Sequence, residues 1–409
     1  MNMASVIIAK GREKSILRQH PWIFSGAVKR VEGDPQPGEI VDVLTHEGQP
    51  LGQGYWNPKS QISVRLLTWS ETVDERWWRR QIERAIHGRM ERGEVPAARR
   101  LVNAENDYLP GLIIDRYGDW LVLQALTLTI DQQKAALAQI AVDVLAGLDV
   151  RIKGVYERSD VDVRRKEGIS QQSGVLWGEE PPEFIHTHLG PDGQAEIWVD
   201  VREGHKTGYY LDQRDNWRVV AEQVRACVDN TRQCRVLNLF SYTGGFSLVA
   251  LANGATSVVN VDRSHDALEL AEKMHEANGF SGASVDAVEF IQADVFEYLR
   301  DQVGQEYDIV ILDPPKFAHN QQQVEKAARG YKDINLNALK LIRPGGFLFT
   351  FSCSGAISRD LFQKIVFGAL DDSKRQAQIL RWLAAADDHP VALTFPEGEY
   401  LKGLLLRVY

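Results

Sequence analysis

The chain has 409 residues, so we expect about two to three domains rather than one compact core. Hydrophobic residues make up 44% and charged residues 25%, which excludes collagen-like, low-complexity and wholly disordered chains. No apolar run approaches the ~18 residues of a membrane span, and the first residues lack the pattern of a secretory signal. We therefore predict a cytoplasmic protein with no membrane partner.

Basic residues gather in two segments of an otherwise acidic chain. The net charge is −9, which taken alone argues against a nucleic-acid partner. Residues 1–30, however, contain six Lys or Arg and one Glu, and residues 76–100 contain eight Arg and three Glu. Because clustered cations bind phosphates whatever the net charge, these segments suggest a phosphate-binding face. The alternative for the second segment is an amphipathic helix whose charges are simply solvated.

The first half of the chain predicts two small modules. Gly and Pro recur about every ten residues over roughly the first 70 positions, and apolar residues alternate with polar ones, which favours a small β-barrel or sandwich. Helical periodicity follows at Glu75 to Arg92 and at Asp131 to Leu148. Strands are expected within 101–127 and from Gly154, which together close a small α+β unit near Gly190.

From about Gln194 the pattern changes to strands alternating with helices, which indicates an α/β domain with a mostly parallel sheet. We expect five such strands, at 234–240, 257–262, 288–294, 307–313 and 347–353, and helices at 246–253, 264–278, 295–302 and 324–342. Two final strands, at 391–395 and 401–409, are expected to add an antiparallel hairpin.

Acidic and glycine residues follow the strands, at the edge where open α/β sheets bind ligands. The first strand enters a turn at Gly244 and Gly245, but Phe240 stands where a dinucleotide fold would need Gly, so a pyrophosphate is not expected. Asp262 is placed to bind a ribose, Asp294 an adenine amine, and Asp313 ends the fourth strand. Three carboxylates would repel phosphate and favour a sulfonium, so we predict S-adenosylmethionine as cofactor. A plain tight turn remains the alternative for the glycine pair alone.

The run from Asp313 to Phe317, which reads DPPKF, is followed one strand later by a thiol at Cys353. Two prolines would fix a carboxylate beside the crevice, while a rigid loop that merely ends the strand is the alternative. A thiolate that adds to C6 of a cytosine turns C5 into a nucleophile, so Cys353 is a candidate catalytic residue; an inert buried thiol is the alternative. Lys316 could help to ionise it.

Other polar residues receive weaker predictions. The run HKTGYYLDQR suggests cofactor-side roles for Lys206, Thr207, Asp212 and Gln213, or else a loop that leads into a helix. Cys227 and Cys234 are predicted to be structural, and because the histidines show no ligand spacing we expect no metal site.

The motifs HKTGYYLDQR, NLFSYTGGFS, DPPKF and TFSCSG, in this order behind a small β module, resemble the bacterial 23S ribosomal RNA cytosine-5 methyltransferases of the RlmI type. The resemblance implies a PUA domain at 1–72, a central EEHEE α+β domain at 73–192 and a Rossmann-like S-adenosylmethionine-dependent methyltransferase domain at 193–409. It implies that Asp313 faces the base and that Cys353 is the nucleophile. It implies that the cofactor is lined by Phe240, Thr243, Gly244, Asp262 and Asp294. We also expect Asn238, Asp313 and Pro314 on the cofactor side.

The leading hypothesis is therefore a methyltransferase that acts on C5 of a cytosine in 23S ribosomal RNA through a covalent adduct between Cys353 and C6. The base would be flipped out of the RNA, with Phe317 or Tyr209 to stack on it, and DNA is not expected as a partner. A homodimer is left open. The DPPKF turn lacks the second cysteine that many RNA cytosine-5 enzymes carry, so two alternatives stand: an RNA guanine or adenine N-methyltransferase, and a non-catalytic RNA-binding assembly factor.

Overall fold

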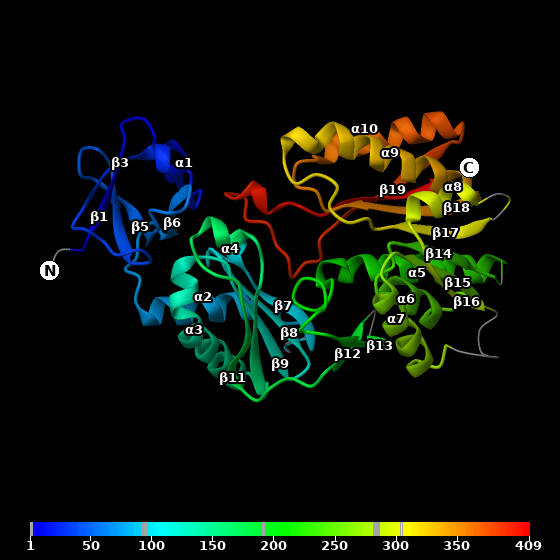
Figure 1. Cartoon of the computed structure of the whole chain (residues 1–409), viewed down its shortest axis with the longest axis horizontal. Coiled ribbons are helices and arrows are strands. Elements are labelled where there is room, and N and C mark those ends of the chain that lie inside the picture. The colour runs from blue at the N-terminus through cyan, green and yellow to red at the C-terminus, as the bar shows by residue number, and fades with distance from the viewer. Residues whose placement is uncertain are drawn as a thin grey trace. The chain divides into compact units, whose positions relative to one another are not determined.

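The computed structural model describes residues 3–91, 93, 96–189, 193–231, 233–280, 287–302, 304 and 306–409. These form two compact units (Figure 1). The first unit runs to Thr187 and includes two later segments, Val199–Leu211 and Asp387–Gly398. The second consists of His188–Trp198, Asp212–Ala386 and Glu399–Tyr409. Arg92 and Gly190, which the sequence places at a helix end and a domain end, lie outside the described residues.

The first unit begins with a six-stranded sheet in the order β2-β6-β5-β4-β1-β3. Its parallel pair is β1 with β4, whereas its other neighbours run antiparallel. Alternating apolar residues such as Val6, Ile8, Val41 and Val64 form a small separate core, as the period-two pattern predicts. The elements are β1 (Ser5–Ile8), α1 (Lys14–Leu17), β2 (Trp22–Phe24), β3 (Val28–Glu32), β4 (Ile40–Leu44), β5 (Pro50–Trp56) and β6 (Ile62–Thr68).

The same unit continues with a five-stranded sheet in the order β11-β10-β9-β8-β7. Figure 1 shows α2 and α3 together on one side of this sheet, and their apolar residues share its core. Helix α2 starts at Glu75 because Asp74 caps it by accepting the N–H of Trp77 at 2.7 Å. The elements are α2 (Glu75–His87), β7 (Ala98–Asn103), β8 (Leu112–Tyr117), β9 (Trp120–Ala125), α3 (Leu128–Ala146), β10 (Gly154–Ser159), α4 (Val163–Lys166) and β11 (Gln172–Gly178).

The second unit is built on a seven-stranded sheet in the order β16-β15-β14-β17-β18-β20-β19. The five neighbouring strands β16, β15, β14, β17 and β18 are mutually parallel. Strand β20 runs antiparallel to both of its neighbours, β18 and β19. This confirms the predicted Rossmann-like sheet with an antiparallel last strand. The strands are β14 (Arg235–Leu239), β15 (Ser257–Asp262), β16 (Ala287–Gln292), β17 (Tyr307–Leu312), β18 (Ile342–Ser352), β19 (Ala377–Ala384) and β20 (Lys402–Val408).

Helices cover both faces of this sheet (Figure 1), with α5 to α7 on one side and α8 to α10 on the other. Such a cover is required because strands β14, β17 and β18 are almost entirely buried. The helices are α5 (Arg214–Thr231), α6 (Gly245–Ala252), α7 (His265–Ala277), α8 (Val295–Asp301), α9 (Val324–Lys340) and α10 (Arg359–Ser373). Strands β12 (Ile185–Leu189) and β13 (Ala195–Val199) precede them.

One predicted strand is wrong. The apolar run 391–395 lies between Pro390 and Pro396 and forms no strand, and the Leu393 side chain is fully exposed. The partner of β20 is instead β19, which follows a helix, α10, that the sequence reading did not include. No helix among the described residues is long and apolar enough to cross a membrane.

Candidate functional site

The parallel strands of the second unit bring the predicted residues to one edge of the sheet. Asp262 is the last residue of β15, while Asp313 and Cys353 directly follow β17 and β18. Phe240 directly follows β14, the central strand at which the chain order of the sheet reverses. Ligands of open α/β sheets bind at such a reversal, beyond the carboxyl ends of the strands.

The loop between β14 and α6 has an unusual backbone. Phe240, Tyr242 and Gly244 have φ values of 60°, 49° and 76°, a region that costs energy for residues with a side chain. A Cβ at Gly244 would lie 2.7 Å from Cε1 of His275, so this position requires glycine. The loop is therefore held in a strained path where it meets the strand ends.

Asp262 fixes this loop to the neighbouring strand. Its Oδ2 accepts the N–H of Tyr242 at 2.8 Å, and its Oδ1 accepts the N–H of Ser264 at 2.9 Å. Asp294 has a different local role, because it caps α8 by accepting the N–H groups of Phe296 and Glu297. Both side chains remain partly exposed, so the predicted ribose and adenine contacts stay predictions.

Gln213, which directly precedes α5, reaches the candidate site, whereas the neighbouring Asp212 is bonded elsewhere. Gln213 Nε2 donates a hydrogen bond of 2.9 Å to Oδ2 of Asp313, which joins this helix start to the end of β17. Asp212 accepts the hydroxyl of Tyr400 at 2.7 Å and is itself buried. Gln213 is thus placed to orient the Asp313 carboxylate, whereas Asp212 is occupied in holding the backbone before β20.

Cys353 lies beside the proline turn, as the order of the strands predicts. Its Sγ is 3.9 Å from the carbonyl oxygen of Pro314, and its side chain is half-buried. The next residue joins the same two segments, because Ser354 Oγ accepts the N–H of Ala318 at 3.2 Å. Pro314 is buried and Lys316 is exposed.

Tyr331 of α9, which the sequence did not predict as a site residue, hydrogen-bonds to the residues on both sides of Cys353. Ser352 Oγ donates to its hydroxyl at 2.9 Å, and Ser354 Oγ lies 3.1 Å from the same oxygen. Burial raises the pKa of this phenol, so it is neutral at physiological pH. The Phe317 ring packs on it with centroids 4.6 Å apart.

Lys402 is the second residue that sequence reasoning missed. Its side chain is only 3% exposed, and its Nζ donates to the carbonyl oxygens of Ser354 and Ile357, each at 2.8 Å. Burial lowers the pKa of this ammonium to about 8. The sequence around Lys402, which follows turn residues and begins an apolar strand, does not predict that its side chain is buried. Its burial follows from the strand register, which places it opposite Ser352.

Three residues predicted on the cofactor side have other bonds. Asn238 is buried and donates to Ser247 Oγ at 2.9 Å. Thr207 belongs to the first unit, where its hydroxyl donates to Asp115 at 2.6 Å. Lys206 also belongs to that unit, and its Nζ lies 4.4 Å from the centroid of the Tyr210 ring. Their cofactor roles stay predictions that these contacts do not support.

Tyr209, predicted to stack on a flipped base, is 3% exposed in the first unit. A ring this buried offers no face for a base. Phe317 is half-buried and already packs on Tyr331, which leaves it the better-placed of the two rings.

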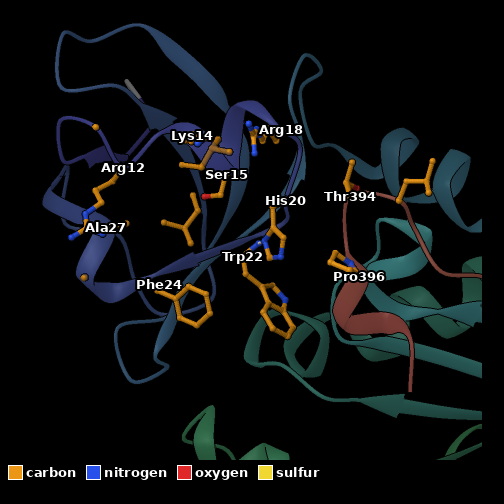
Figure 2. A pocket seen from close by; sticks show the side chains of 15 residues that line it. Arg12, Lys14, Ser15, Arg18, His20, Trp22, Phe24, Ala27, Thr394 and Pro396 are labelled. Atoms are coloured by element: carbon orange, nitrogen blue, oxygen red, sulfur yellow. The ribbon is translucent and has the colours of Figure 1, made fainter. Parts of the chain in front are cut away.

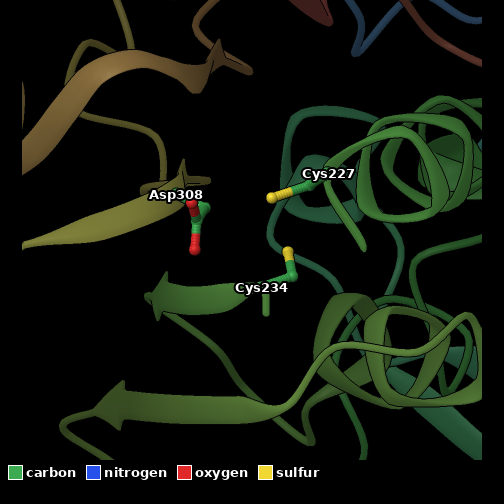
Figure 3. A group of neighbouring side chains, drawn as sticks. All are labelled: Cys227, Cys234 and Asp308. Atoms are coloured by element: carbon green, nitrogen blue, oxygen red, sulfur yellow. The ribbon is translucent and has the colours of Figure 1, made fainter. Parts of the chain in front are cut away.

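A second group of reactive side chains lies at the opposite ends of the strands (Figure 3). Cys227 of α5, Cys234 before β14 and Asp308 of β17 are buried, and their ligand atoms lie within 4.8 Å of one another. The contact with Cys227, together with burial, raises the pKa of the Cys234 thiol. The Asp308 carboxylate already accepts Arg235 N–H at 2.7 Å and pairs with Arg343 at 2.8 Å. The Cys234 thiol is therefore protonated, and both thiols are buried, which agrees with a structural role.

The first basic segment lines a groove of about 870 Å³ in the first unit (Figure 2). Arg12, Lys14 and Arg18 are exposed, and among the described residues none of them forms an ion pair. Trp22 and Phe24 add aromatic surface, and Phe24 is 51% exposed. Clustered cations beside exposed rings can bind both the phosphates and the bases of a single strand.

The second basic segment does not form such a face. Arg89 makes two bonds of 2.7 Å to Asp107, and Arg100 makes bonds of 2.7 and 2.8 Å to Asp115. Arg99 pairs with Glu91 and Asp387, and all three arginines are buried. These three arginines hold the interior of the first unit together. On α2, in contrast, Arg76, Arg79, Arg80 and Arg84 are exposed, which agrees with the alternative of a solvated helix face.

Two family models match the chain. One, described as a PUA-like domain, matches residues 6–69, and the other, described as an S-adenosylmethionine-dependent methyltransferase, matches residues 186–407. Ribosomal RNA large subunit methyltransferase I of Aeromonas hydrophila is 45% identical over 99% of this chain and 99% of its own. The protein of the same name from Escherichia coli O127:H6 is 44% identical over 98% of this chain and 99% of its own.

Solved structures share the fold over nearly the whole chain. An S-adenosylmethionine-dependent methyltransferase from Streptococcus mutans superposes with a TM-score of 0.76 at 21% identity, covering 98% of this chain and 99% of its own. SMU.776, a methyltransferase complexed with SAH, has a TM-score of 0.78 at 22% identity and the same coverage. At this identity the likeness shows the architecture.

Proposed function

Because the chain belongs to the family of ribosomal RNA large subunit methyltransferase I, we propose that it methylates C5 of a cytosine in 23S ribosomal RNA. The observation that carries the choice of C5 is the thiol of Cys353, 3.9 Å from the Pro314 carbonyl in the Asp313 turn. Methylation of an aromatic carbon needs a nucleophile that activates the ring, whereas methylation of an amine does not.

The residues at the strand ends suit S-adenosylmethionine. Asp262 offers a partly exposed carboxylate to a ribose. The buried Ser241 and Thr243 hydroxyls of the same loop have no hydrogen-bond partner among the described residues. Bound there, the cofactor would supply a methyl group on a positively charged sulfur, which the carboxylates Asp262, Asp294 and Asp313 would attract.

The chain's own residues would then act on the cytosine ring. The Cys353 thiolate would form a bond from Sγ to C6, and the electron pair of the C5–C6 double bond would move to C5. C5 would take the methyl group, and the electron pair of the broken S–CH3 bond would stay on the cofactor sulfur as a neutral thioether. Loss of the C5 proton to a base then restores the double bond, while the S–C6 bond breaks and its electron pair returns to Sγ. Asp313, oriented by Gln213, would hold the polar edge of the base during both steps.

RNA would be held in part by the basic groove of the PUA-like module. Arg12, Lys14 and Arg18 would contact phosphates, and Phe24 would stack on an unpaired base. The target cytosine must leave its stack before Cys353 can reach C6, so we propose that it is flipped out. The cytoplasmic location and a homodimer stay predictions from the sequence.

A single substitution tests the chemistry. Cys353→Ser should abolish methyl transfer to 23S ribosomal RNA but leave the Kd for S-adenosylmethionine, measured by calorimetry, within about twofold. The Cys227→Ser variant is the matched control and should remain active. Nucleoside mass spectrometry of the methylated RNA identifies the product. Methylation retained by the Cys353 variant, or a product methylated on guanine or adenine nitrogen, would exclude the covalent mechanism.

A further inference from the structure

The strand register places a buried cation beside the candidate nucleophile. Strand β20 pairs with β18 so that Lys402 stands opposite Ser352, the residue before Cys353. Because Lys402 is almost fully buried, its ammonium cannot be solvated by bulk water and must find partners within the protein. Burying a lysine here therefore costs free energy unless its ammonium is hydrogen-bonded or paired with a charge.

The ammonium clasps the turn that begins after Cys353. Its Nζ donates to the carbonyl oxygens of Ser354 and Ile357 at 2.8 Å, and Ile357 N–H itself donates to Ser354 O at 3.0 Å. The backbone from 354 to 357 is thus closed on itself and tied to β20. A thiol at the start of so constrained a turn has its direction fixed before substrate arrives.

The charges around Lys402 allow it to remain protonated at neutral pH. Its pKa is lowered to about 8, chiefly by burial, and the neighbouring charges of Arg359 and Lys316 act in the same direction. Glu399 and a charged Cys353 act in the opposite direction and raise the pKa. Interaction between two charges is reciprocal, so the ammonium also favours the thiolate form of Cys353.

We propose that Lys402 is a positioning residue that aims Cys353 and keeps its thiol ionised at neutral pH. An unassisted thiol, with a pKa of about 8.5, is only a few per cent thiolate at pH 7. This inference rests on the proposed function, because an ionised Cys353 matters only if Cys353 attacks the base. In this proposal Lys402 acts through the carbonyl oxygens of the turn and does not touch substrate or cofactor.

The test measures the ionisation of Cys353 directly. Iodoacetamide alkylation of the full chain is followed from pH 6 to 10, and the Cys353 peptide is quantified by mass spectrometry to separate it from Cys227 and Cys234. The wild-type midpoint should lie below about 8.5, and Lys402→Met should raise it by about one pH unit or more. Lys402→Arg should keep the wild-type midpoint. Lys364→Met, at an exposed site on α10, is the control and should also keep it.

Activity provides the second readout. Lys402→Met should lower kcat for RNA methylation at pH 7 at least tenfold without changing KM for S-adenosylmethionine, and raising the pH should restore part of the rate. A wild-type midpoint at or above about 8.5, an unchanged midpoint in Lys402→Met, or an equal rise in Lys402→Arg would overturn the inference. A wild-type midpoint at or above about 8.5 would overturn the inference even if Lys402→Met does not fold. Alkylation also does not require methylation, so it separates this inference from failure of the proposed function.

Discussion

Gln213 donates from Nε2 to Oδ2 of Asp313 across 2.9 Å, although four helices, α5 to α8, separate the two residues in the chain. A hydrogen bond to a charged group contributes about 1.5–3 kcal/mol. The side chain of Gln213 is buried, so no water readily replaces it.

Replacing Gln213 by Ala should therefore lower kcat/KM for RNA methylation by roughly tenfold to a hundredfold, because Asp313 loses its orienting donor. Steady-state methylation assays measure this loss. Glu222→Gln, at an exposed site on α5, the helix that follows Gln213, is the control and should change the rate less than twofold. Equal rates for wild type and Gln213→Ala would show that Asp313 needs no orientation by this residue.

The buried pair of Arg89 and Asp107 should dominate the stability of the first unit. Arg89→Ala leaves the Asp107 carboxylate buried without its cation, which costs about 3–5 kcal/mol of unfolding free energy. Urea unfolding, followed by tryptophan fluorescence, measures the change. Arg80→Ala removes an exposed arginine from α2, the helix that ends just before Arg89, and should change the free energy by less than about 0.5 kcal/mol. Similar losses for both variants would contradict a special role for burial.

The basic groove should bind RNA through phosphate contacts. Replacing Arg12, Lys14 and Arg18 together by Gln should weaken RNA binding and reduce the slope of log K against log salt by about two, because each single-strand phosphate contact contributes about 0.7. Fluorescence anisotropy at several salt concentrations measures the slope. The triple change of Arg76, Arg79 and Arg80 to Gln on α2 is the control, and a larger effect there would place the RNA on another face.

His275 should make the second unit sensitive to acid. Burial lowers its pKa from 6.5 to about 4, although the hydrogen bond between its Nδ1 and Ala271 O acts in the opposite direction. Its Nε2 is buried with no partner among the described residues. Between these two pH values the unfolded chain binds a proton that the folded chain does not. The contribution of His275 to the free energy of unfolding is therefore fully present above pH 6.5 and is lost as the pH falls toward 4.

Acidification through that window should cost wild type about 3 kcal/mol more than His275→Gln, which has no group to protonate. Urea unfolding at a series of pH values gives the two curves. His265→Gln, at an exposed site on the same helix, should follow wild type. Parallel curves for wild type and His275→Gln would show that this histidine does not carry the acid sensitivity.

The sequence predicted the parallel strands because a strand buried on both faces is a nearly continuous apolar run, as in β17. It predicted the candidate site because parallel strands end at one edge. It did not predict β19, whose residues are mostly exposed at the sheet edge, and instead selected the apolar run 391–395 between two prolines. The domain limits at 72 and 192 stay predictions.

The environment of the charged side chains was the property that the sequence predicted least well. Arg89 and Arg18 look alike in a count of basic residues, yet one is buried on Asp107 and the other lines an open groove. Lys402 was missed for the same reason, since only long-range pairing decides whether a cation meets water or protein. Local sequence can locate a charge but cannot assign its partner.

The place of β20 in the sheet also sets an order of assembly. This strand is synthesised after both of its neighbours, β18 and β19, and yet it lies between them. During synthesis β19 therefore has no strand to pair with until β20 emerges and enters the gap. Such late, long-range pairing slows folding and exposes strand edges. A nascent chain would carry the Cys353 turn without its clasp, so the nucleophile would be completed among the last events of folding.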